Sequence, residues 1–506
     1  MLTDELIFQI KRQFALEPTA EQADALRTFA CFMMDDDPHA VMILRGSAGT
    51  GKTSLAAAIV RTMVTLGQKV MLLAPTGRAA KVFAMNSTHP AYTIHHQIYR
   101  QKTFEGDGGV FNLNYNRHAD TLFLVDECSM ISNRGMPDSS FGSGCLLDDL
   151  VQFVYGGRNC KMVLIGDQAQ LPPIGETESP ALNADFLQGY GLKTYECTLS
   201  EVLRQSRQSG ILYNATLIRQ MITRDELTEL PQIHFHGFAD IKMVPGDELI
   251  ETLNDSYTEV GMDETIVVTR SNKRANIYNR GIRNTILDRE EELSSGDWLM
   301  VVRNNYFWLQ QATESSVNNA PLASDAAASS TMQETEKDGN GTNGISFLAN
   351  GDRALVQRVR NVREVYGFRF ADVWLQFPDY DRYELQATVV LDSLNTEAPA
   401  LTPAQNERLF QEVMADYADI PLKQERLKKM RQDKLLNAIQ VKYAYAITCH
   451  KAQGGQWAHV YLDQGYMTDD MLTPDYVHWL YTAFTRATEH LYLVNWPKTQ
   501  THDNDD

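Results

Sequence analysis

A glycine-rich segment carries the residue types that bind the phosphates of a nucleoside triphosphate. It follows the apolar run 41–44 and precedes an alanine-rich run with helical character. Glycines allow backbone N–H groups to converge on phosphate oxygens, and the start of a helix adds partial positive charge. Lys52 is placed to reach the outer phosphates, and the hydroxyl of Thr53 is placed to hold Mg²⁺. The residues expected to bind the nucleotide are Gly46, Ser47, Ala48, Gly49, Thr50, Gly51, Lys52 and Thr53.

Two adjacent carboxylates follow another apolar run, residues 122–125. Hydrolysis of a phosphoanhydride needs a metal ligand and a group that orients or deprotonates the attacking water. Asp126 is placed for the first task, through a water molecule, and Glu127 is placed for the second. A strand that ends in Asp-Glu is common by itself. Its position downstream of a phosphate-binding segment favours the catalytic interpretation.

A third apolar run, 163–165, leads into Gly166 and Asp167 and then into a double proline at 172–173. Between them stands Gln170, whose amide can both donate and accept hydrogen bonds. It can therefore sense a γ-phosphate without adding charge. A proline-rich turn by itself does not explain glutamine and aspartate at these positions, so the segment indicates a further nucleotide-sensing loop.

The composition of the 506-residue chain is that of a soluble protein with several domains, since 43% of its residues are hydrophobic and 22% are charged. No apolar run approaches the roughly 18 residues of a membrane span. Acidic residues stand at the N-terminus, where a signal peptide would carry basic ones. The six cysteines form no Cys-x-x-Cys pair, so a metal cluster or a disulfide framework is not expected. We expect a cytoplasmic protein without membrane contact.

The formal net charge of −19, from 46 Lys and Arg against 65 Asp and Glu, argues mildly against broad affinity for nucleic acid. A basic channel on an acidic body is still compatible with this charge, because fields act locally over a Debye length of ~8 Å. Some of the acidic residues, at 35–37 and in the tail 503–506, are placed where they would not line a channel.

Short apolar runs alternate with helix-like segments along most of the chain, which is typical of parallel sheets that bind ligands at their carboxyl edge. The runs fall into two sets, so we expect two α/β lobes. The first set comprises 41–44, 70–74, 121–125 and 162–165, and the second comprises 266–269, 443–447, 460–462 and 490–494.

Runs rich in aromatic and β-branched residues interrupt the second set and predict a small inserted β-barrel; they are 297–303, 353–359, 366–377 and 383–391. Between Phe370 and Val373 the apolar positions shift by one residue, which predicts a bulge or bend. The insert also contains a segment, 311–344, whose composition predicts disorder. A charged stretch at 402–437 is expected to be helical, either as a solvated helix or as a basic surface for nucleic-acid backbone.

The motif Gly-Asp-x-x-Gln-Leu-Pro-Pro at 166–173, after a Walker-type loop and a strand that ends in Asp-Glu, resembles superfamily 1 helicases. More narrowly, it resembles the RecD/Dda group of superfamily 1B, AAA-type P-loop ATPases with UvrD-like C-terminal motifs. One departure is Gln456, which stands where this family often has an acidic residue. Further motifs of the family stand in the expected order at 17–22, 74–81, 93–95, 201–205, 350–352, 448–454 and 481–487.

The resemblance implies an α/β fold of two RecA-like P-loop lobes, with a β-hairpin pin inserted in the first lobe and an SH3-like β-barrel inserted in the second. Two short predicted strands around a glycine-rich turn, at 101–113, stand where the family has its strand-separating pin. There Phe104 or Phe111 would stack on the last base pair. The expected bounds are 1–192 for the first lobe, 97–120 for its hairpin, 193–290 and 441–506 for the second lobe, and 291–440 for the insert.

The resemblance also implies roles for single residues. Gln22 would read the edge of adenine, and Arg204 and Arg486 would reach the γ-phosphate from the second lobe. For Arg486 the alternative is an ordinary structural arginine on a helix. The residues expected to contact a DNA strand are Thr76, Lys81, Thr93, His95, Phe104, Thr448, His450 and Lys451. Threonine and histidine at these places would also serve as helix caps or turn residues.

The function implied by the resemblance is that of an ATP-dependent DNA helicase that uses ATP and Mg²⁺ and moves 5′ to 3′. Its partners would be single-stranded DNA and junctions between single-stranded and duplex DNA. An RNA-directed or dual-substrate helicase is an alternative, because a motor that grips phosphates and stacked bases need not recognise a 2′-hydroxyl. Two further alternatives are a translocase that strips proteins from a strand without unwinding it, and an ATPase switch that is not a motor.

Overall fold

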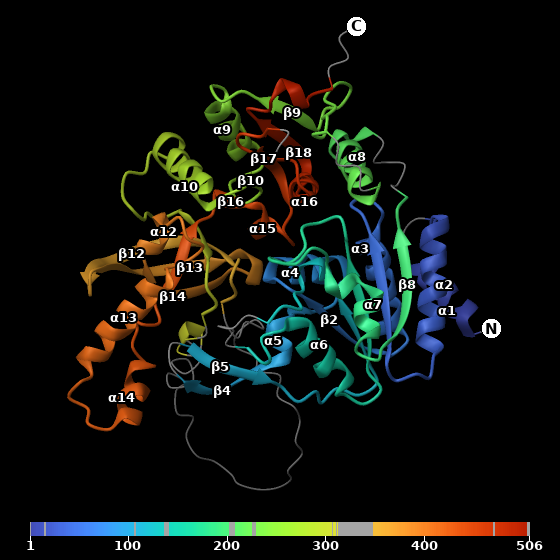
Figure 1. The fold of residues 1–506 in the computed structure, drawn as a ribbon, viewed down its shortest axis with the longest axis horizontal. Coiled ribbons are helices and arrows are strands. Elements are labelled where there is room, and N and C mark those ends of the chain that lie inside the picture. The colour runs from blue at the N-terminus through green and yellow to red at the C-terminus, as the bar shows by residue number, and fades with distance from the viewer. Residues whose placement is uncertain are drawn as a thin grey trace, which may run out of the picture. The chain divides into compact units, whose positions relative to one another are not determined.

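The computed structural model describes residues 2–14, 17–105, 108–135, 141–201, 208–224, 229–305, 307–309, 311, 348–468 and 471–502. The chain divides into two compact units (Figure 1). One unit comprises Met1–Glu290 together with Ala444–Asp506, and the other comprises Glu291–Tyr443. The second unit is therefore an insertion in the sequence of the first. Of the segment that was predicted to be disordered, all residues after Gln311 lie outside the described residues.

The first lobe is built on a parallel sheet with the strand order β3-β2-β6-β7-β1-β8. The central strands β6 and β7 are buried along their whole length, and apart from Thr121 and Lys161 at their starts their side chains are apolar or absent. The edge strand β8 is exposed or half-buried along most of its length, and only its last residue, Leu199, is buried. The bounds are β1 (Ala40–Gly46), β2 (Lys69–Ala74), β3 (Ala91–Thr93), β6 (Thr121–Val125), β7 (Lys161–Gly166) and β8 (Lys193–Leu199).

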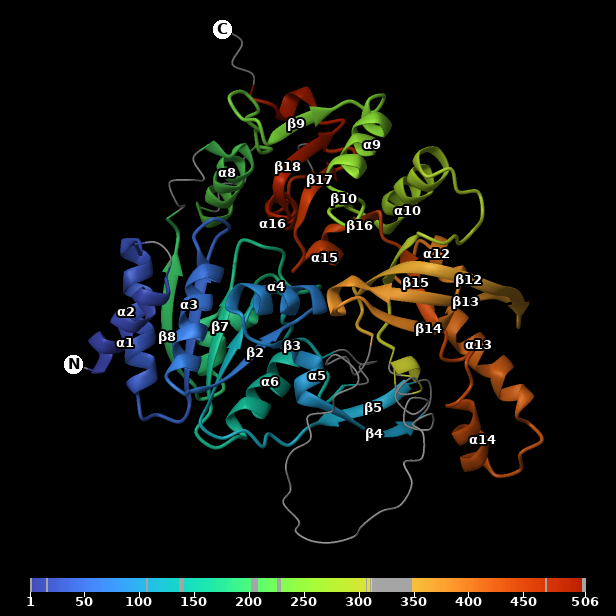
Figure 2. The same cartoon turned by 180° about the vertical axis from the view of Figure 1, so that it is seen from behind.

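Helix α2 lies next to β8, and α1 packs beside α2 (Figures 1 and 2). Side chains from α1, α2 and α3 form one hydrophobic core with the sheet, to which Leu6, Phe29 and Ile59 contribute together with Met42 and Leu124. The helices of this lobe are α1 (Leu2–Gln13), α2 (Ala20–Met34), α3 (Lys52–Thr65), α4 (Gly77–Ser87), α5 (Ile94–Ile98), α6 (Leu146–Tyr155) and α7 (Ala184–Gln188), with short 3₁₀ turns at Cys128–Met130 and Pro180–Leu182.

A β-hairpin, β4 (Tyr99–Glu105) and β5 (Gly108–Leu113), leaves the first lobe between α5 and β6, as the sequence predicts. Its base is fastened by aromatic packing and hydrogen bonds. The ring of Phe111 stacks on that of Phe141 at 5.0 Å, and the hydroxyl of Tyr99 donates to Asp149 (2.6 Å). The base of the hairpin is therefore anchored to α6 of the same lobe.

The second lobe is built on a second parallel sheet, with the strand order β16-β10-β17-β18-β9. Its strands are β9 (Ile241–Val244), β10 (Thr265–Thr269), β16 (Ala446–Thr448), β17 (Trp457–Asp463) and β18 (Ala487–Val494). Its helices are α8 (Gly210–Arg224), α9 (Leu249–Glu259), α10 (Asn272–Gly281), α15 (Cys449–Ala452) and α16 (Pro474–Phe484), with a π-helical turn at Ile282–Ile286 and a 3₁₀ turn at Lys498–Gln500.

The predicted strand 443–447 is wrong as a single element. The barrel strand β15 ends at Tyr443, and the sheet strand β16 begins at Ala446. The cause is Asn279, whose side-chain oxygen accepts hydrogen bonds from the backbone N–H groups of Tyr445 (3.1 Å) and Ala446 (2.8 Å). A buried amide from α10 thus takes the donors that a continuous strand would have used, and the chain passes from one unit to the other at this point.

The inserted unit is a closed barrel of β11 (Trp298–Val301), β12 (Arg353–Val365), β13 (Phe368–Phe377), β14 (Tyr383–Val390) and β15 (Ile439–Tyr443). The predicted irregularity next to Phe370 is confirmed. The pairing of β12 with β13 shifts between Arg360 and Arg363, and Asn361 has a φ of 50° there. The extra residues lie on β12, because β13 keeps continuous register with β14. With its two parallel sheets, hairpin and barrel, the chain has the predicted fold class.

Helices stand between the barrel strands β14 and β15, including α13 (Pro403–Asp416) and α14 (Lys423–Met430) within the stretch predicted to be helical. They are amphipathic: Leu409, Val413 and Met430 pack with Phe368 and Phe370 in one core. The remaining elements of this unit are α12 (Asp392–Asn395) and a 3₁₀ turn at Pro378–Tyr380. Lys428 and Lys429 of α14 are exposed, which agrees with a solvated helix and leaves the basic-surface alternative open.

Asp352 is a buried carboxyl in the barrel, at a turn between two described strands. One oxygen accepts a hydrogen bond from the hydroxyl of Tyr380 (2.9 Å), and the other accepts from the backbone N–H of Ala349 (2.7 Å). Burial, which is the largest effect, raises the pKa of Asp352 to about 7. The pKa of Asp352 therefore differs between the folded and the unfolded protein.

Replacing Asp352 with asparagine is expected to flatten the pH dependence of thermal stability between about pH 4 and 7, from the ordinary pKa of the carboxyl to its raised pKa. Because the folded state raises this pKa, the carboxyl stabilises the fold while it is protonated, and this contribution is lost as the pH rises toward about 7. An asparagine cannot ionise, so the variant should unfold at a higher temperature than wild type at pH 8. Calorimetry of both proteins over this range measures the effect. Asp381→Asn, at an exposed position nearby, is the control, and equal pH slopes for Asp352→Asn and wild type would contradict the prediction.

Candidate nucleotide site

The phosphate loop connects β1 to α3, and its shape depends on glycines. Gly49 and Gly51 have φ angles of 76° and 80°, in the left-handed region that favours glycine. At Gly46 a Cβ would lie 2.7 Å from Cγ of Lys52, because the lysine side chain passes over this position. The Nζ of Lys52 donates a hydrogen bond to the carbonyl oxygen of Ser47 (2.9 Å). The loop is thus formed around its own lysine, whose ammonium group can transfer to a phosphate oxygen.

Asp126 and Glu127 follow β6, at the same carboxyl edge of the sheet as the phosphate loop. The backbone N–H of Asp126 donates to the carbonyl oxygen of Leu73 (2.9 Å), and its carboxylate accepts from the N–H of Glu127 (2.8 Å). Burial and the charge of Glu127 raise the pKa of Asp126 to about 7, whereas nearby Lys52 lowers it. Ionisation of Asp126 is therefore unfavourable at this position, and a bound cation would stabilise its ionised carboxylate.

The residues present fit a bound Mg²⁺ ion. Mg²⁺ prefers oxygen ligands and is commonly held by one or two protein groups together with substrate phosphates. Asp126 supplies a half-buried carboxylate, and Thr53 supplies a hydroxyl in the first turn of α3. These two side chains are the candidate ligands, as the sequence indicates.

Gln170 lies in the loop that follows β7. Its side chain is 6% exposed, and its Oε1 has no hydrogen-bond partner among the described residues. Its backbone N–H donates to the carbonyl oxygen of Asp167 (3.3 Å), which closes a tight turn. A buried polar atom without a partner costs free energy that a ligand or a water molecule would recover. Gln170 therefore offers an acceptor beside the predicted nucleotide site.

Arg486 has a different place from the one expected. It is buried inside the second lobe, where its Nε donates to the carbonyl oxygen of Thr482 (2.9 Å) and its two terminal nitrogens donate to Gly455 and Thr485 (3.0 Å each). These bonds fasten the end of α16 to the loop after α15. In this structure Arg486 therefore has the structural role that was its alternative, and Arg204 lies outside the described residues.

An arginine that the motifs did not single out contacts the phosphate loop from the second lobe. This is Arg219 on α8, which donates hydrogen bonds to the hydroxyl of Ser47 and to the carbonyl oxygen of Ser200. Arg219 stands outside every motif of the resemblance, so only its position in the fold reveals it. Tyr481, the first residue of the motif at 481–487, also contacts the phosphate loop. No role was predicted for this tyrosine.

Gln22 is buried, and its side chain joins α2 to the phosphate loop. Its Nε2 donates to the carbonyl oxygen of Thr50 (2.9 Å), and its Oε1 accepts from the backbone N–H of Thr19 (3.0 Å) in a capping box. The amide keeps one N–H that could meet a base. Reading of adenine by Gln22 stays a prediction.

Two of the threonines predicted to contact DNA cap helices. Thr76 accepts a hydrogen bond from the N–H of Ala79 (3.2 Å) at the start of α4, and Thr93 accepts from the N–H of His96 (3.3 Å) at the start of α5. Such caps satisfy backbone donors that a helix leaves free at its first turn. The capping alternative is therefore realised for both residues.

His95 belongs to the aromatic packing at the base of the hairpin. Its ring lies 5.0 Å from that of Phe141 and 5.6 Å from that of Tyr99. Burial lowers the pKa of His95 to about 4, so the ring is neutral at physiological pH. His95 is therefore packed as an aromatic ring at the base of the hairpin, and its contact with DNA stays a prediction.

The other residues that were predicted to contact a DNA strand lie on α15 in the second lobe and on α4 and the hairpin in the first lobe. Thr448 stands at the N-terminus of α15 without capping it through its side chain, and His450 is exposed in the same turn. Lys451 follows in this helix, and Lys81 lies on α4. The side chain of Phe104 is outside the described part of the chain. Contact with DNA stays a prediction for these residues.

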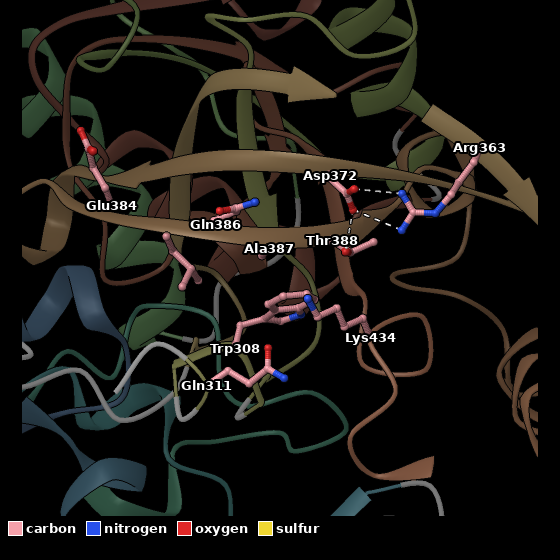
Figure 3. A pocket seen from close by; sticks show the side chains of 10 residues that line it. Trp308, Gln311, Arg363, Asp372, Glu384, Gln386, Ala387, Thr388 and Lys434 are labelled. Atoms are coloured by element: carbon pink, nitrogen blue, oxygen red, sulfur yellow. Dashed lines mark hydrogen bonds and ion pairs between the residues drawn. The ribbon is translucent and has the colours of Figure 1, made fainter. Parts of the chain in front are cut away.

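The barrel carries a cavity of its own (Figure 3). Asp372 lies between Arg363 and Thr388, accepting hydrogen bonds from the two terminal nitrogens of the arginine (3.0 and 3.2 Å) and from the threonine hydroxyl (2.9 Å). Trp308 and Lys434 also line this cavity. The Asp372 carboxylate therefore already has partners within the barrel.

The fold and the site define a P-loop ATPase with two parallel-sheet lobes and an inserted barrel. Comparison with protein families finds an AAA domain at residues 17–232 and a UvrD-like helicase C-terminal domain at residues 443–494. None of the helices that the structure describes has the length and apolar character to cross a membrane.

Three curated proteins illustrate the similarity. An uncharacterized protein of Acanthamoeba polyphaga mimivirus is 22% identical over 90% of this chain and 96% of its own length. The ATP-dependent RecD2 DNA helicase of Deinococcus radiodurans is 30% identical over 27% of this chain and 16% of its length. The ATP-dependent DNA helicase dda of Enterobacteria phage T4 is 25% identical over 51% of this chain and 55% of its length. The chain thus spans only part of the two relatives with named activities. Together with the matched domains, they confirm the predicted resemblance to the RecD/Dda group of superfamily 1B.

Solved structures of Pif1 helicases are also similar to this chain. Bacteroides Pif1 in complex with ADP-AlF3 and single-stranded DNA has 14% sequence identity and a TM-score of 0.44, covering 97% of this chain and 95% of that one. Pif1 from Candida albicans has 14% identity and a TM-score of 0.40, covering 97% of each chain.

Proposed function

We propose that this chain is an ATP-dependent DNA helicase that loads on single-stranded DNA, moves 5′ to 3′ and unwinds duplex by ATP-driven closure of its two RecA-like lobes. The observation that carries the proposal is that the phosphate loop touches the second lobe: Ala48 contacts Tyr481, and Ser47 contacts Arg219. A nucleotide bound at this loop can therefore change how the lobes meet. The relatives RecD2 and dda are named ATP-dependent DNA helicases, which supports DNA as the polymer.

The chemistry of hydrolysis would be divided among side chains of the first lobe. Lys52 and the backbone N–H groups of the loop would bind the outer phosphates of ATP. Glu127 would accept a proton from the attacking water, and Gln170 would orient that water with its Oε1. Mg²⁺ held by Thr53 and Asp126 would supply positive charge at the β- and γ-phosphates.

Arginines of the second lobe would complete the site when the lobes close. Arg204 is proposed from the family resemblance, and Arg219 is proposed from its contact with Ser47. Positive charge at the γ-phosphate stabilises the transition state of phosphoryl transfer, and its arrival from a second lobe links hydrolysis to motion. Arg486 is proposed to stiffen the joint between α16 and the loop after α15.

One DNA strand is proposed to cross both lobes at the starts of α4 and α15. The start of α4 meets the segment that follows α15: a Cβ on Gly454 would lie 3.0 Å from the hydroxyl of Thr76, and the guanidinium of Arg78 lies 4.4 Å from the ring centre of Trp457. Helix starts and hydroxyl or ammonium groups suit phosphate contacts. The residues proposed for these contacts are Thr76, Lys81, Thr93, His95, Thr448, His450 and Lys451. The β4–β5 hairpin, with Phe104 or Phe111, is proposed as the pin.

Unwinding of fluorescent duplexes that carry a 5′ tail, a 3′ tail or no tail tests this function, with ATP and Mg²⁺ present. We expect strand displacement from the 5′-tailed duplex alone. Displacement only from the 3′-tailed duplex would refute the direction. If single-stranded DNA failed to stimulate ATP hydrolysis, the helicase assignment itself would be wrong, and a matched RNA oligonucleotide in the same assay separates the RNA-directed alternative.

A further inference from the structure

Tyr481 is a buried polar side chain that joins the two lobes. It lies on α16 of the second lobe and is 1% exposed. Its hydroxyl accepts a hydrogen bond from the backbone N–H of Ala48 in the phosphate loop (3.0 Å) and donates one to Asp167 (2.6 Å). Burial and the charge of Asp167 raise the pKa of Tyr481 well above its ordinary range, so the hydroxyl stays a donor. One atom thus links α16, the phosphate loop and the loop that carries Gln170.

Three more side chains of the second lobe hold the backbone on either side of Gln170. Thr482, next to Tyr481, accepts a hydrogen bond from the N–H of Leu171 (2.7 Å). Gln453 donates to the carbonyl oxygen of the same residue (2.7 Å). The Nδ1 of His478 lies 2.9 Å from the carbonyl oxygen of Ala169, which can only accept, so this nitrogen carries the hydrogen. The position of the Gln170 backbone is therefore set by the second lobe.

We propose that Tyr481 and Thr482 are positioning residues that set the phosphate loop and Gln170 in the geometry for hydrolysis. This inference rests on the proposed function, because it assumes that Gln170 acts on the γ-phosphate or on the attacking water. The bonds are shielded from solvent, so water cannot replace a missing hydroxyl at little cost. Movement of α16 is transmitted to both loops at once through these two hydroxyl groups.

Tyr481→Phe removes one oxygen and keeps the ring, and it tests the proposal. We expect kcat for ATP hydrolysis to fall about tenfold, with and without single-stranded DNA, while KM for ATP changes less than about twofold, because orientation is lost rather than binding. The control is Tyr476→Phe on the same helix. Tyr476 is equally buried, but its hydroxyl bonds to Gln464 and Gln500 inside the second lobe. This variant should keep wild-type kcat.

Substitutions of Thr482 give a second, independent measurement. Thr482→Val keeps the shape but cannot accept from Leu171, so kcat should fall, and Thr482→Ser keeps the hydroxyl and should restore most of it. Equal kcat for Tyr481→Phe, Thr482→Val and wild type would overturn the proposal. An equal loss in Tyr476→Phe would overturn it too, since the effect would then be general loosening of α16. If DNA does not stimulate wild type, the helicase function fails, and basal turnover of these variants still decides the role of the two residues.

Discussion

Replacing Lys52 with alanine is expected to lower ATP turnover in the presence of single-stranded DNA by about 100-fold or more and to abolish unwinding. The ammonium group of Lys52 is the positive charge of the phosphate loop itself, and its Nζ donates a hydrogen bond to the carbonyl oxygen of Ser47. On nucleotide binding this group would move to the phosphates, where charge accumulates during transfer. Release of inorganic phosphate and displacement of a tailed strand measure the two effects.

The control for this experiment is Lys69→Ala, which removes an exposed lysine at the start of β2 in the same lobe. It should keep wild-type turnover and wild-type unwinding. Thermal unfolding of both variants should match wild type, because the Lys52 side chain packs over Gly46 without filling the core. Turnover of Lys52→Ala within about tenfold of wild type would mean that the phosphate loop is not the ATP site.

The place of the candidate nucleotide-binding residues in the fold could be predicted from the sequence because each part of the candidate site is local. The loop from Gly46 to Thr53 takes its shape from glycines and from the strand and helix beside it, and all of these are contiguous. Asp126 and Glu127 reach the same edge because parallel strands bring their carboxyl ends together. Strand bounds such as β6 also followed from uninterrupted apolar runs.

What the sequence did not predict depends on contacts between distant segments. Arg219 is separated from Ser47 by 172 positions, and no local pattern marks it. Arg486 has a motif, but the motif does not reveal that Thr482, Thr485 and Gly455 would take its donors. In each case the outcome was decided by which groups the folded chain places within hydrogen-bonding distance.

Contacts within the folded chain also decide the surroundings of the residues that were predicted to contact a DNA strand. Thr76 and Thr93 stand before helices, where capping competes with a ligand for the hydroxyl. His95 became neutral because Phe141 and Tyr99 surround it at the hairpin base. Sequence alone gives the residue type and the helix start, and only packing decides whether the side chain remains available.

Replacing Glu127 with glutamine is expected to lower kcat for ATP hydrolysis by about 10²- to 10⁴-fold while leaving ATP binding intact. An amide of the same size can still hold a water molecule, but it cannot take the proton. Glu127 also raises the pKa of Asp126, so the neutral variant should leave Asp126 more readily ionised and available to Mg²⁺. Binding of a fluorescent ATP analogue and single-turnover hydrolysis separate these two effects.

Glu178→Gln, at an exposed position of the first lobe, is the matched control and should behave as wild type. The decisive pattern is tight nucleotide binding with slow hydrolysis in Glu127→Gln, against weak binding in Lys52→Ala. If Glu127→Gln instead lost ATP affinity and kept its kcat, the carboxylate would be acting as a metal ligand. The base would then have to be another group, and Gln170 could not fill that place, because an amide cannot accept a proton near neutral pH.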